Sequence, residues 1–286
     1  KLEPGINGPT SMAAIRNADS NLAAIRRTLD ELGLAETTDI VVSADHGFST
    51  ISKQSDTSGA ARASYADVPP GMLPPGFLAI DLAAALNLPL FDPEAANAKV
   101  ESGNHPKNSD GLIGEDANAP KIAVAANGGS DLVYVPSGDR ELVQKTIDAL
   151  LAQDYVSGLF VDDHLGTFAG TLPLSAINLE GASLMPRPSI VVNFKSFSTG
   201  CAKPELCAVV VADTGLQQGQ GMHGSFGRGD TANFMAAFGP SFKKGFVSEA
   251  PVSNADVGQT IATILGLMPK SHGKLVGRAL SEALTN

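Results

Sequence analysis

The stretch DIVVSADHGF, residues 39–48, joins a run of aliphatic residues to an Asp-His-Gly turn. A continuous β-branched run is typical of a strand buried on both faces of a parallel sheet. In open α/β sheets, ligands bind beyond the C-terminal ends of such strands, which is where Asp45 and His46 fall. Their carboxylate oxygen and imidazole nitrogen suit Zn²⁺. From three residues alone, a helix-capping Asp beside an ordinarily hydrogen-bonded His remains an open alternative.

A helix is expected immediately before this strand. Apolar residues recur at helical spacing from Ile15 to Leu32, Thr10 or Ser11 is positioned to cap the helix, and Gly33 follows its last turn. A helix followed by a buried strand is half of a βαβ unit. The pattern therefore predicts that a further strand precedes residue 1, so that the chain begins inside a fold.

The rest of the chain alternates between expected strands and helices. Strands are expected at residues 121–126, 131–136, 156–161, 190–194, 207–212 and 233–238. Helices are expected at residues 80–86 and 140–153, and from Asn254 or Asp256 to Leu265. Residues 49–75 and 215–229 are rich in Gly and polar residues and should be irregular. This alternation predicts an open α/β sheet, and no linker divides it into two domains.

A second candidate for metal binding lies in the glycine-rich stretch 219–225, which follows the expected strand at 207–212. His223 stands there between Met222 and Gly224. Flanking glycines would let the backbone turn an imidazole toward a metal ion, but glycines also occur in any flexible loop. Taken alone, His223 is better explained as a loop histidine, with a metal ligand as the alternative.

Four ordered blocks of the sequence resemble the type I phosphodiesterases and nucleotide pyrophosphatases of the alkaline phosphatase superfamily. The blocks are INGPTS (6–11) before a helix containing Asp19, VVSADHG (41–47), MHGS with RGDT and MAAFGPSF (within 222–242), and ADV through ILGL (255–267). The resemblance spans nearly the whole chain, although residues 50–188 match poorly.

The resemblance implies an alkaline phosphatase-like open sheet with helices on both faces and with the N-terminal part of the fold missing. Residues 1–286 would be the C-terminal part of one such domain, with a peripheral insertion at about 50–188. The family uses two divalent metal ions, expected here to be Zn²⁺ with Mn²⁺ as an alternative. By analogy Asp45 and His46 hold one ion, and His223 helps to hold the other.

Other parts of the family's site have no counterpart in this sequence. Counting back from Gly8 by the usual spacing to the Asp-x-x-x-His ligand pair reaches Lys1 and Gly5, which cannot replace it. The Thr or Ser nucleophile is likewise expected upstream of residue 1. Arg228 could contact a phosphate oxygen and Asp230 could orient an imidazole, although a loop salt bridge explains these two residues better.

The resemblance implies that the longer protein hydrolyses phosphate mono- or diesters by in-line attack of a hydroxyl group that one metal ion activates. A sulfatase, phosphonate hydrolase or phosphomutase of the same superfamily is an alternative. A different alternative is that these 286 residues alone are a non-catalytic fragment.

The remaining histidines are weaker candidates for the site. His105 is interpreted as a solvated loop residue, Asp162–His164 as a polar hairpin turn, and His272 as part of a structural turn.

Composition limits the partners. The formal net charge is −10 and the Lys and Arg residues are scattered, so no nucleic acid-binding patch is expected. No apolar run approaches the roughly 18 residues of a membrane span. The expected partners are a small phosphate ester and the missing N-terminal half.

Cys201 and Cys207 could form a disulfide, which would favour a periplasmic or secreted protein; two reduced cysteines at a strand edge are the alternative.

Overall fold

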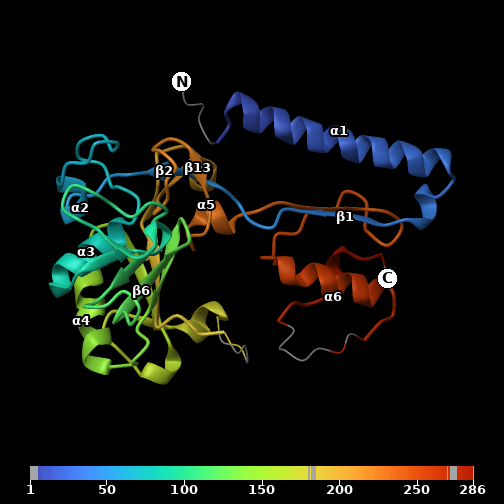
Figure 1. The fold of residues 1–286 in the computed structure, drawn as a ribbon. Helices are drawn as coiled ribbons and strands as arrows, with labels where there is room; N and C mark the ends of the chain where they lie inside the picture. Colours follow the sequence, from blue (N-terminus) through green and yellow to red (C-terminus); the bar gives the residue numbers. More distant parts are fainter. Residues whose placement is uncertain (1–5, 180, 182–184, 269, 271–275, 286) are drawn as a thin grey trace. The chain divides into compact units, whose positions relative to one another are not determined.

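The computed structural model describes residues 6–179, 181, 185–268, 270 and 276–285, which form two compact units (Figure 1). The first unit is built mainly from Phe48–Thr231. The second combines Asn7–Gly47 with Ala232–Asn286. Each unit therefore has its own strands and helices, and the second brings together two distant parts of the sequence.

The first unit contains an eight-stranded sheet in the spatial order β4-β3-β5-β6-β7-β10-β8-β9. Neighbouring strands pair antiparallel except β8 and β9, which are parallel. The strands are β3 (Leu90–Asp92), β4 (Ala98–Lys99), β5 (Gly111–Ile113), β6 (Ile122–Ala126), β7 (Ser130–Tyr134), β8 (Val156–Val161), β9 (Leu172–Pro173) and β10 (Ile190–Phe194).

A four-stranded sheet in the order β11-β12-β2-β13 completes the first unit. Its strands are β2 (Ser49–Ser52), β11 (Ser196–Ser198), β12 (Ala208–Val211) and β13 (Gly221–Met222). β2 lies parallel to β12 and antiparallel to β13. A backbone bridge between Gly128 and Asp213 joins this sheet to the loop that precedes β7.

In the first unit, α3 (Phe77–Leu86) and α4 (Arg140–Leu151) pack against strands of the larger sheet (Figure 1). Helix α2 (Gly59–Arg62) contacts α3, and α5 (Arg228–Thr231) contacts β12 of the smaller sheet. The 3-10 turns are η2 (Pro93–Ala95), η3 (Asp163–Leu165), η4 (Leu174–Ile177) and η5 (Pro204–Cys207). The core of this unit is aliphatic, apart from a group of rings. Phe77 lies 4.9 Å from Tyr155 and 5.2 Å from Phe194, measured between ring centroids, and all three rings are buried.

The second unit contains the two-stranded antiparallel sheet of β1 (Ile40–Ser43) and β14 (Met235–Phe238). Its helices are α1 (Pro9–Glu31) and α6 (Asn254–Ile264), with 3-10 turns η1 (Ala35–Thr37) and η6 (Ser281–Ala283). Ser253 and Asp256 form a reciprocal capping box that fixes the start of α6. Helix α1 has no buried residue, and both buried apolar clusters found in the described residues lie in the first unit.

Most expected elements are present within one to three residues of their predicted bounds, and β8 begins and ends where predicted. Gly33 follows α1 with φ +67°, as expected. The expected cap at Thr10 or Ser11 is wrong: the N-cap residue is Gly8, because Pro9 fits the first helical position and starts the helix earlier.

Two further local expectations are corrected. β1 is not a strand buried between parallel neighbours: it pairs antiparallel with β14, and its residues are half-buried or exposed. The choice of β14 as partner depends on residues almost 200 positions away. Residues 162–164 do not form a hairpin turn either, because Asp162 caps the 3-10 turn η3 between the parallel strands β8 and β9.

Candidate functional site

The Asp45-His46 turn follows β1 directly and is fixed to its own unit by hydrogen bonds. The amide of Asn233 donates to the carbonyl of Ala44 at 2.9 Å, and the amide of Asn254 donates to the carbonyl of Asp45 at 2.6 Å. Asn254 is the first residue of α6. A strand end and a helix start thus position the turn, with the Asp45 side chain exposed and His46 half-buried.

A hydrogen bond of the His46 ring indicates which of its two nitrogens carries a proton. Its Nδ1 lies 2.7 Å from the carbonyl oxygen of Gly47, which can only accept, so we assign the proton to Nδ1. In the neutral ring Nε2 then carries the lone pair. This nitrogen lies 3.5 Å from Oδ2 of Asp45, a separation that suits both an ion pair with a protonated ring and two ligands of one metal ion.

This arrangement fits a divalent metal ion. Zn–N and Zn–O bonds of about 2.1 Å meeting at a tetrahedral angle separate the two ligand atoms by roughly 3.4 Å, close to the observed distance between Nε2 and Oδ2. A histidine ligand whose other ring nitrogen donates to a backbone carbonyl is also the usual arrangement at metal sites. The donor set of Asp45 and His46 therefore suits the ion that the sequence predicts.

His223 lies at the end of β13 in the first unit, where its side chain is exposed. β13 pairs with β2 so that Met222 lies opposite Ser49, and the His223 ring centroid is 6.2 Å from that of Phe48. Gly221 permits this approach, because a Cβ there would collide with the Phe48 ring. Phe48 is the residue at which the first unit begins after the Asp45-His46 turn, and His223 lies beside it within that unit.

Asp230 is buried and ties the His223 loop to β2. Its carboxylate accepts from the Ser49 hydroxyl at 2.5 Å, and from the backbone N–H and hydroxyl of Ser225 at 2.8 and 2.7 Å. These contacts fix Ser225, two residues after His223, against the first residue of β2. Arg228 is exposed and begins the short helix α5.

A buried charge cluster in the first unit was not predicted. Lys53, Asp131 and Asp213 are 4%, 0% and 1% exposed. Burial lowers the pKa of Lys53 to about 8, and the two carboxylates partly offset that effect. Burial and the neighbouring Asp213 raise the pKa of Asp131 well above its ordinary value. Lys53 and Asp213 stand just after β2 and β12, a strand-end position that could have marked both in the sequence.

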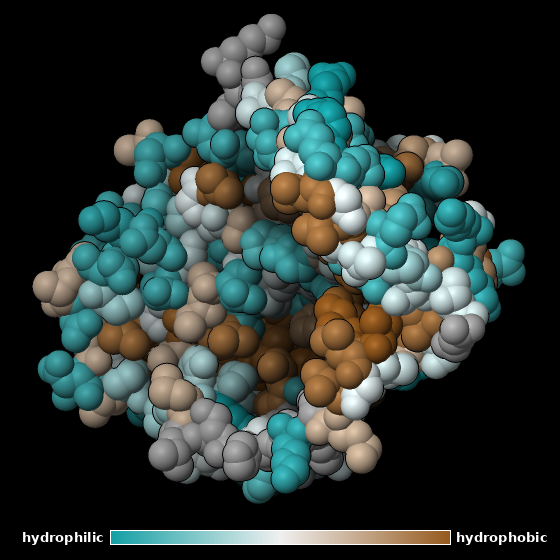
Figure 2. Space-filling view, turned by 90° about the vertical axis from the view of Figure 1, so that its right-hand side faces the viewer, coloured by the Kyte–Doolittle hydropathy of each residue, from teal (hydrophilic) through white to brown (hydrophobic). Residues whose placement is uncertain are grey.

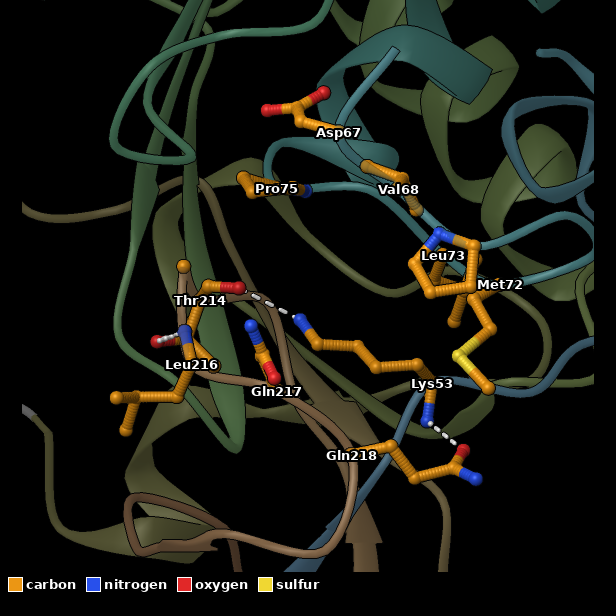
Figure 3. A pocket seen from close by; sticks show the side chains of 12 residues that line it. Lys53, Asp67, Val68, Met72, Leu73, Pro75, Thr214, Leu216, Gln217 and Gln218 are labelled. Atoms are coloured by element: carbon orange, nitrogen blue, oxygen red, sulfur yellow. Dashed lines mark hydrogen bonds between the residues drawn. The ribbon is translucent and has the colours of Figure 1, made fainter. Parts of the chain in front are cut away.

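Lys53 also lines a cavity of about 570 Å³ together with Met72, Leu73 and Leu216. Figure 3 shows its side chain extended toward Thr214. The ammonium group donates to the carbonyls of Ala212 at 2.9 Å and Thr214 at 2.6 Å. Because these bonds hold the end of β12 and the loop that follows, Lys53 stabilises the chain that leads to β13.

The other histidines are placed as follows. His105 lies between the carbonyl of Pro106, 2.8 Å from Nδ1, and the carboxylate of Asp67, 3.2 Å from Nε2. His164 contacts Asp162 at 3.0 Å. His272 lies outside the described residues, as do Lys1 and Gly5. Over the residues that the structure describes, no group of three or more His, Cys, Asp or Glu side chains is arranged to hold a metal ion.

Cys201 and Cys207 form a disulfide, with their Cα atoms 6.1 Å apart. The bridge closes the segment between β11 and β12, which contains η5. Among the described helices, none combines the length and the apolar character that crossing a membrane requires.

Comparison with known proteins gives a family and a fold. The family model for type I phosphodiesterase / nucleotide pyrophosphatase matches residues 3–225, a range that includes Asp45, His46 and His223. No curated protein sequence matches the chain.

Among solved structures, human ectonucleotide pyrophosphatase / phosphodiesterase 5 has a similar fold, with a TM-score of 0.55 and 13% sequence identity. The similarity covers 99% of this chain and 55% of that one, so this chain spans about half the length of the human structure. This likeness confirms the α/β fold class predicted from the sequence.

Proposed function

The chain belongs to the type I phosphodiesterase / nucleotide pyrophosphatase family, and on that basis we propose that the protein containing it is a metal-dependent hydrolase of phosphate mono- or diesters. The observation that carries this proposal is the family match over residues 3–225, together with the fit of Asp45 and His46 to a metal ion. Two divalent ions are proposed, Zn²⁺ in the first instance and Mn²⁺ as the alternative.

In this proposal Asp45 and His46 are ligands of one ion and His223 is a ligand of the other. His223 is included because residues 222–225 resemble the family's last ligand histidine and lie within the range that the family model matches. When bound, such ions lower the pKa of an attacking hydroxyl and offset the charge that develops on phosphate oxygens. Each candidate ligand is supported within its own unit: Asn254 fixes the Asp45 turn, and Asp230 fixes the loop after His223.

Arg228 is proposed to contact a phosphate oxygen of the substrate. A guanidinium group presents several N–H donors in a planar fork that matches phosphate geometry. Its exposed position five residues after His223, at the start of α5, supports this role. Asp230 is proposed to act on the site through Ser225, the residue that it binds.

The remaining ligands and the Thr or Ser nucleophile are proposed to come from a further part of the same polypeptide. Apolar side chains of the second unit support this proposal, because several are more than half exposed: Ile15, Ile25, Leu32, Leu265 and Leu267. In Figure 2, apolar residues (brown) are exposed on the face turned to the viewer. An isolated two-stranded sheet such as β1–β14 is marginal in water and normally gains neighbours.

A second candidate follows from the length comparison: the 286 residues alone are a non-catalytic portion of the enzyme. The chain matches 55% of the human structure, and its three candidate ligands divide between two ions. We propose that the protein is periplasmic or secreted, because the Cys201–Cys207 disulfide persists best in an oxidising compartment. The name of the structurally similar human protein, ectonucleotide pyrophosphatase / phosphodiesterase 5, agrees with that setting.

The test is a substrate panel on the full-length protein supplied with Zn²⁺ or Mn²⁺. We expect hydrolysis of p-nitrophenyl phosphate, its diester, or both, and no cleavage of p-nitrophenyl sulfate. The 286-residue chain assayed alone should be inactive. Preferential cleavage of the sulfate or of a phosphonate ester would move the assignment to another branch of the superfamily, and a full-length protein inactive on every ester would overturn the proposal.

A further inference from the structure

The backbone of His223 and Gly224 rests against a tight turn from a distant part of the sequence. Residues 127–129, Asn-Gly-Gly, connect β6 to β7, and the turn includes Ser130, the first residue of β7. The N–H of Gly129 donates to the carbonyl of His223 at 3.3 Å, and the hydroxyl of Ser130 donates to the carbonyl of Gly224 at 2.5 Å. Two consecutive peptide groups of the His223 loop are therefore held from one side by this turn.

The turn is itself rigidly held. The N–H of Asn127 donates to the carbonyl of Ser130 at 3.0 Å, which closes the turn. The carbonyl of Gly129 accepts from the N–H of Phe194 at 3.2 Å, and that residue ends the fully buried strand β10. The position of the turn is thus set by the larger sheet rather than by the exposed loop that it supports.

Contact between the turn and the loop is too close for any side chain at position 129. A Cβ on Gly129 would lie 2.7 Å from the backbone nitrogen of Ser225 and 2.8 Å from its Cβ. Such distances are not tolerated, so the loop would have to move by several tenths of an ångström. A displacement of that size is enough to disturb a ligand whose bond to the metal must be kept within about 0.2 Å.

We infer that Gly129 and Ser130 are positioning residues for His223: they set where its backbone, and hence its imidazole, can meet a metal ion. The inference rests on the proposed role of His223 as a ligand. The turn contacts the main chain of the His223 loop through the N–H of Gly129 and the hydroxyl of Ser130. In metal proteins, partners that orient a ligand typically change the metal affinity by about 10–100-fold when they are removed.

The test uses the full-length protein with stoichiometric Zn²⁺ and follows the histidine ring signals by NMR, with metal affinity measured by titration. The His223 signals are identified by their loss in His223→Ala. In Gly129→Ala and in Ser130→Ala we expect the zinc-induced shift of His223 to decrease and the affinity to fall by about 10–100-fold. The ring signals of His105, held in the same unit by Asp67 and Pro106, should not change.

Gly158→Ala is the matched control, because a Cβ there meets nothing closer than 3.9 Å. Ser130→Ala is the milder of the two variants and keeps the test valid if Gly129→Ala fails to fold, which far-UV circular dichroism would show. Wild-type zinc shifts and affinity in both folded variants would overturn the inference. If zinc leaves His223 unperturbed in the wild-type protein, the ligand assignment of the proposed function fails instead.

Discussion

Asp131 carries a carboxylate that the folded protein holds at an energetic disadvantage. It is fully buried, its Oδ2 has no hydrogen-bond partner among the described residues, and the Asp213 carboxylate is a neighbour. Burial and that neighbour raise its pKa above the unfolded value of 3.8. A raised folded pKa contributes stability that is present below the unfolded pKa and is lost as the pH rises through the folded pKa.

We therefore predict that Asp131→Asn stabilises the protein at pH 8 and flattens the fall in stability above about pH 4. Asparagine keeps the shape without ionising, and its amide can donate toward Asp213. The expected gain in unfolding free energy at pH 8 is about 1–3 kcal/mol, measured by urea denaturation at several pH values. Asp148→Asn, on the exposed face of α4, is the control. A variant less stable than wild type at pH 8 would contradict this account.

The ligand candidates Asp45, His46 and His223 could be proposed from sequence because each stands in a short pattern with its own chemistry. The residues that hold these candidates in place could not be proposed from the sequence. Asp230 and the turn at Gly129 act through Ser225, His223 and Gly224, and nothing in the sequence pairs residue 129 with residue 223. Lys53, Asp131 and Asp213 are similarly far apart along the chain, so only the fold shows that their charges interact.

At the scale of elements, Asp81 connects α3, in which it lies, to α2 and to the residue that precedes β8. Its carboxylate accepts from the hydroxyl of Ser58 at 2.6 Å, the N–H of Ala60 at 2.8 Å and the hydroxyl of Tyr155 at 3.1 Å. Asp81 lies in α3, Ser58 caps α2, and Tyr155 precedes β8. This buried carboxylate therefore links two helices to the residue that precedes β8.

We predict that Tyr155→Phe lowers the unfolding free energy by about 1–2 kcal/mol, because it removes a buried donor to a carboxylate while keeping the ring contacts with Phe77 and Phe194. Chemical denaturation measures the change. Tyr134→Phe, at a half-buried position in β7, serves as the comparison and should change stability by less than about 0.5 kcal/mol. Equal stabilities of the wild type and Tyr155→Phe would show that the hydrogen bond adds nothing.

Element types follow from local patterns, and most were predictable for that reason. The β-branched run in β10 and the apolar spacing in α4 each reflect burial on a defined face. Strand partners are set by residues far away, so they were not predictable. The sequence of β1 suits parallel neighbours on both sides, yet β14 pairs with it antiparallel among the described residues.

At the scale of the whole molecule, the two units differ in how they are stabilised. The first unit contains the buried apolar clusters, whereas α1 of the second has no buried residue. Composition could not show this difference, because apolar residues are spread through the entire sequence. The resemblance of the four sequence blocks did indicate the family, which the match over residues 3–225 establishes.

The most direct test of the central claim is the metal dependence of bis(p-nitrophenyl) phosphate hydrolysis by the full-length protein. We predict that removal of metal with EDTA abolishes hydrolysis, that Zn²⁺ or Mn²⁺ restores it, and that His46→Ala lowers kcat/KM by at least about 100-fold, because the ions supply most of the charge stabilisation. Hydrolysis that is unchanged after metal removal, or in His46→Ala, would contradict the assignment of the Asp45-His46 turn as a metal site.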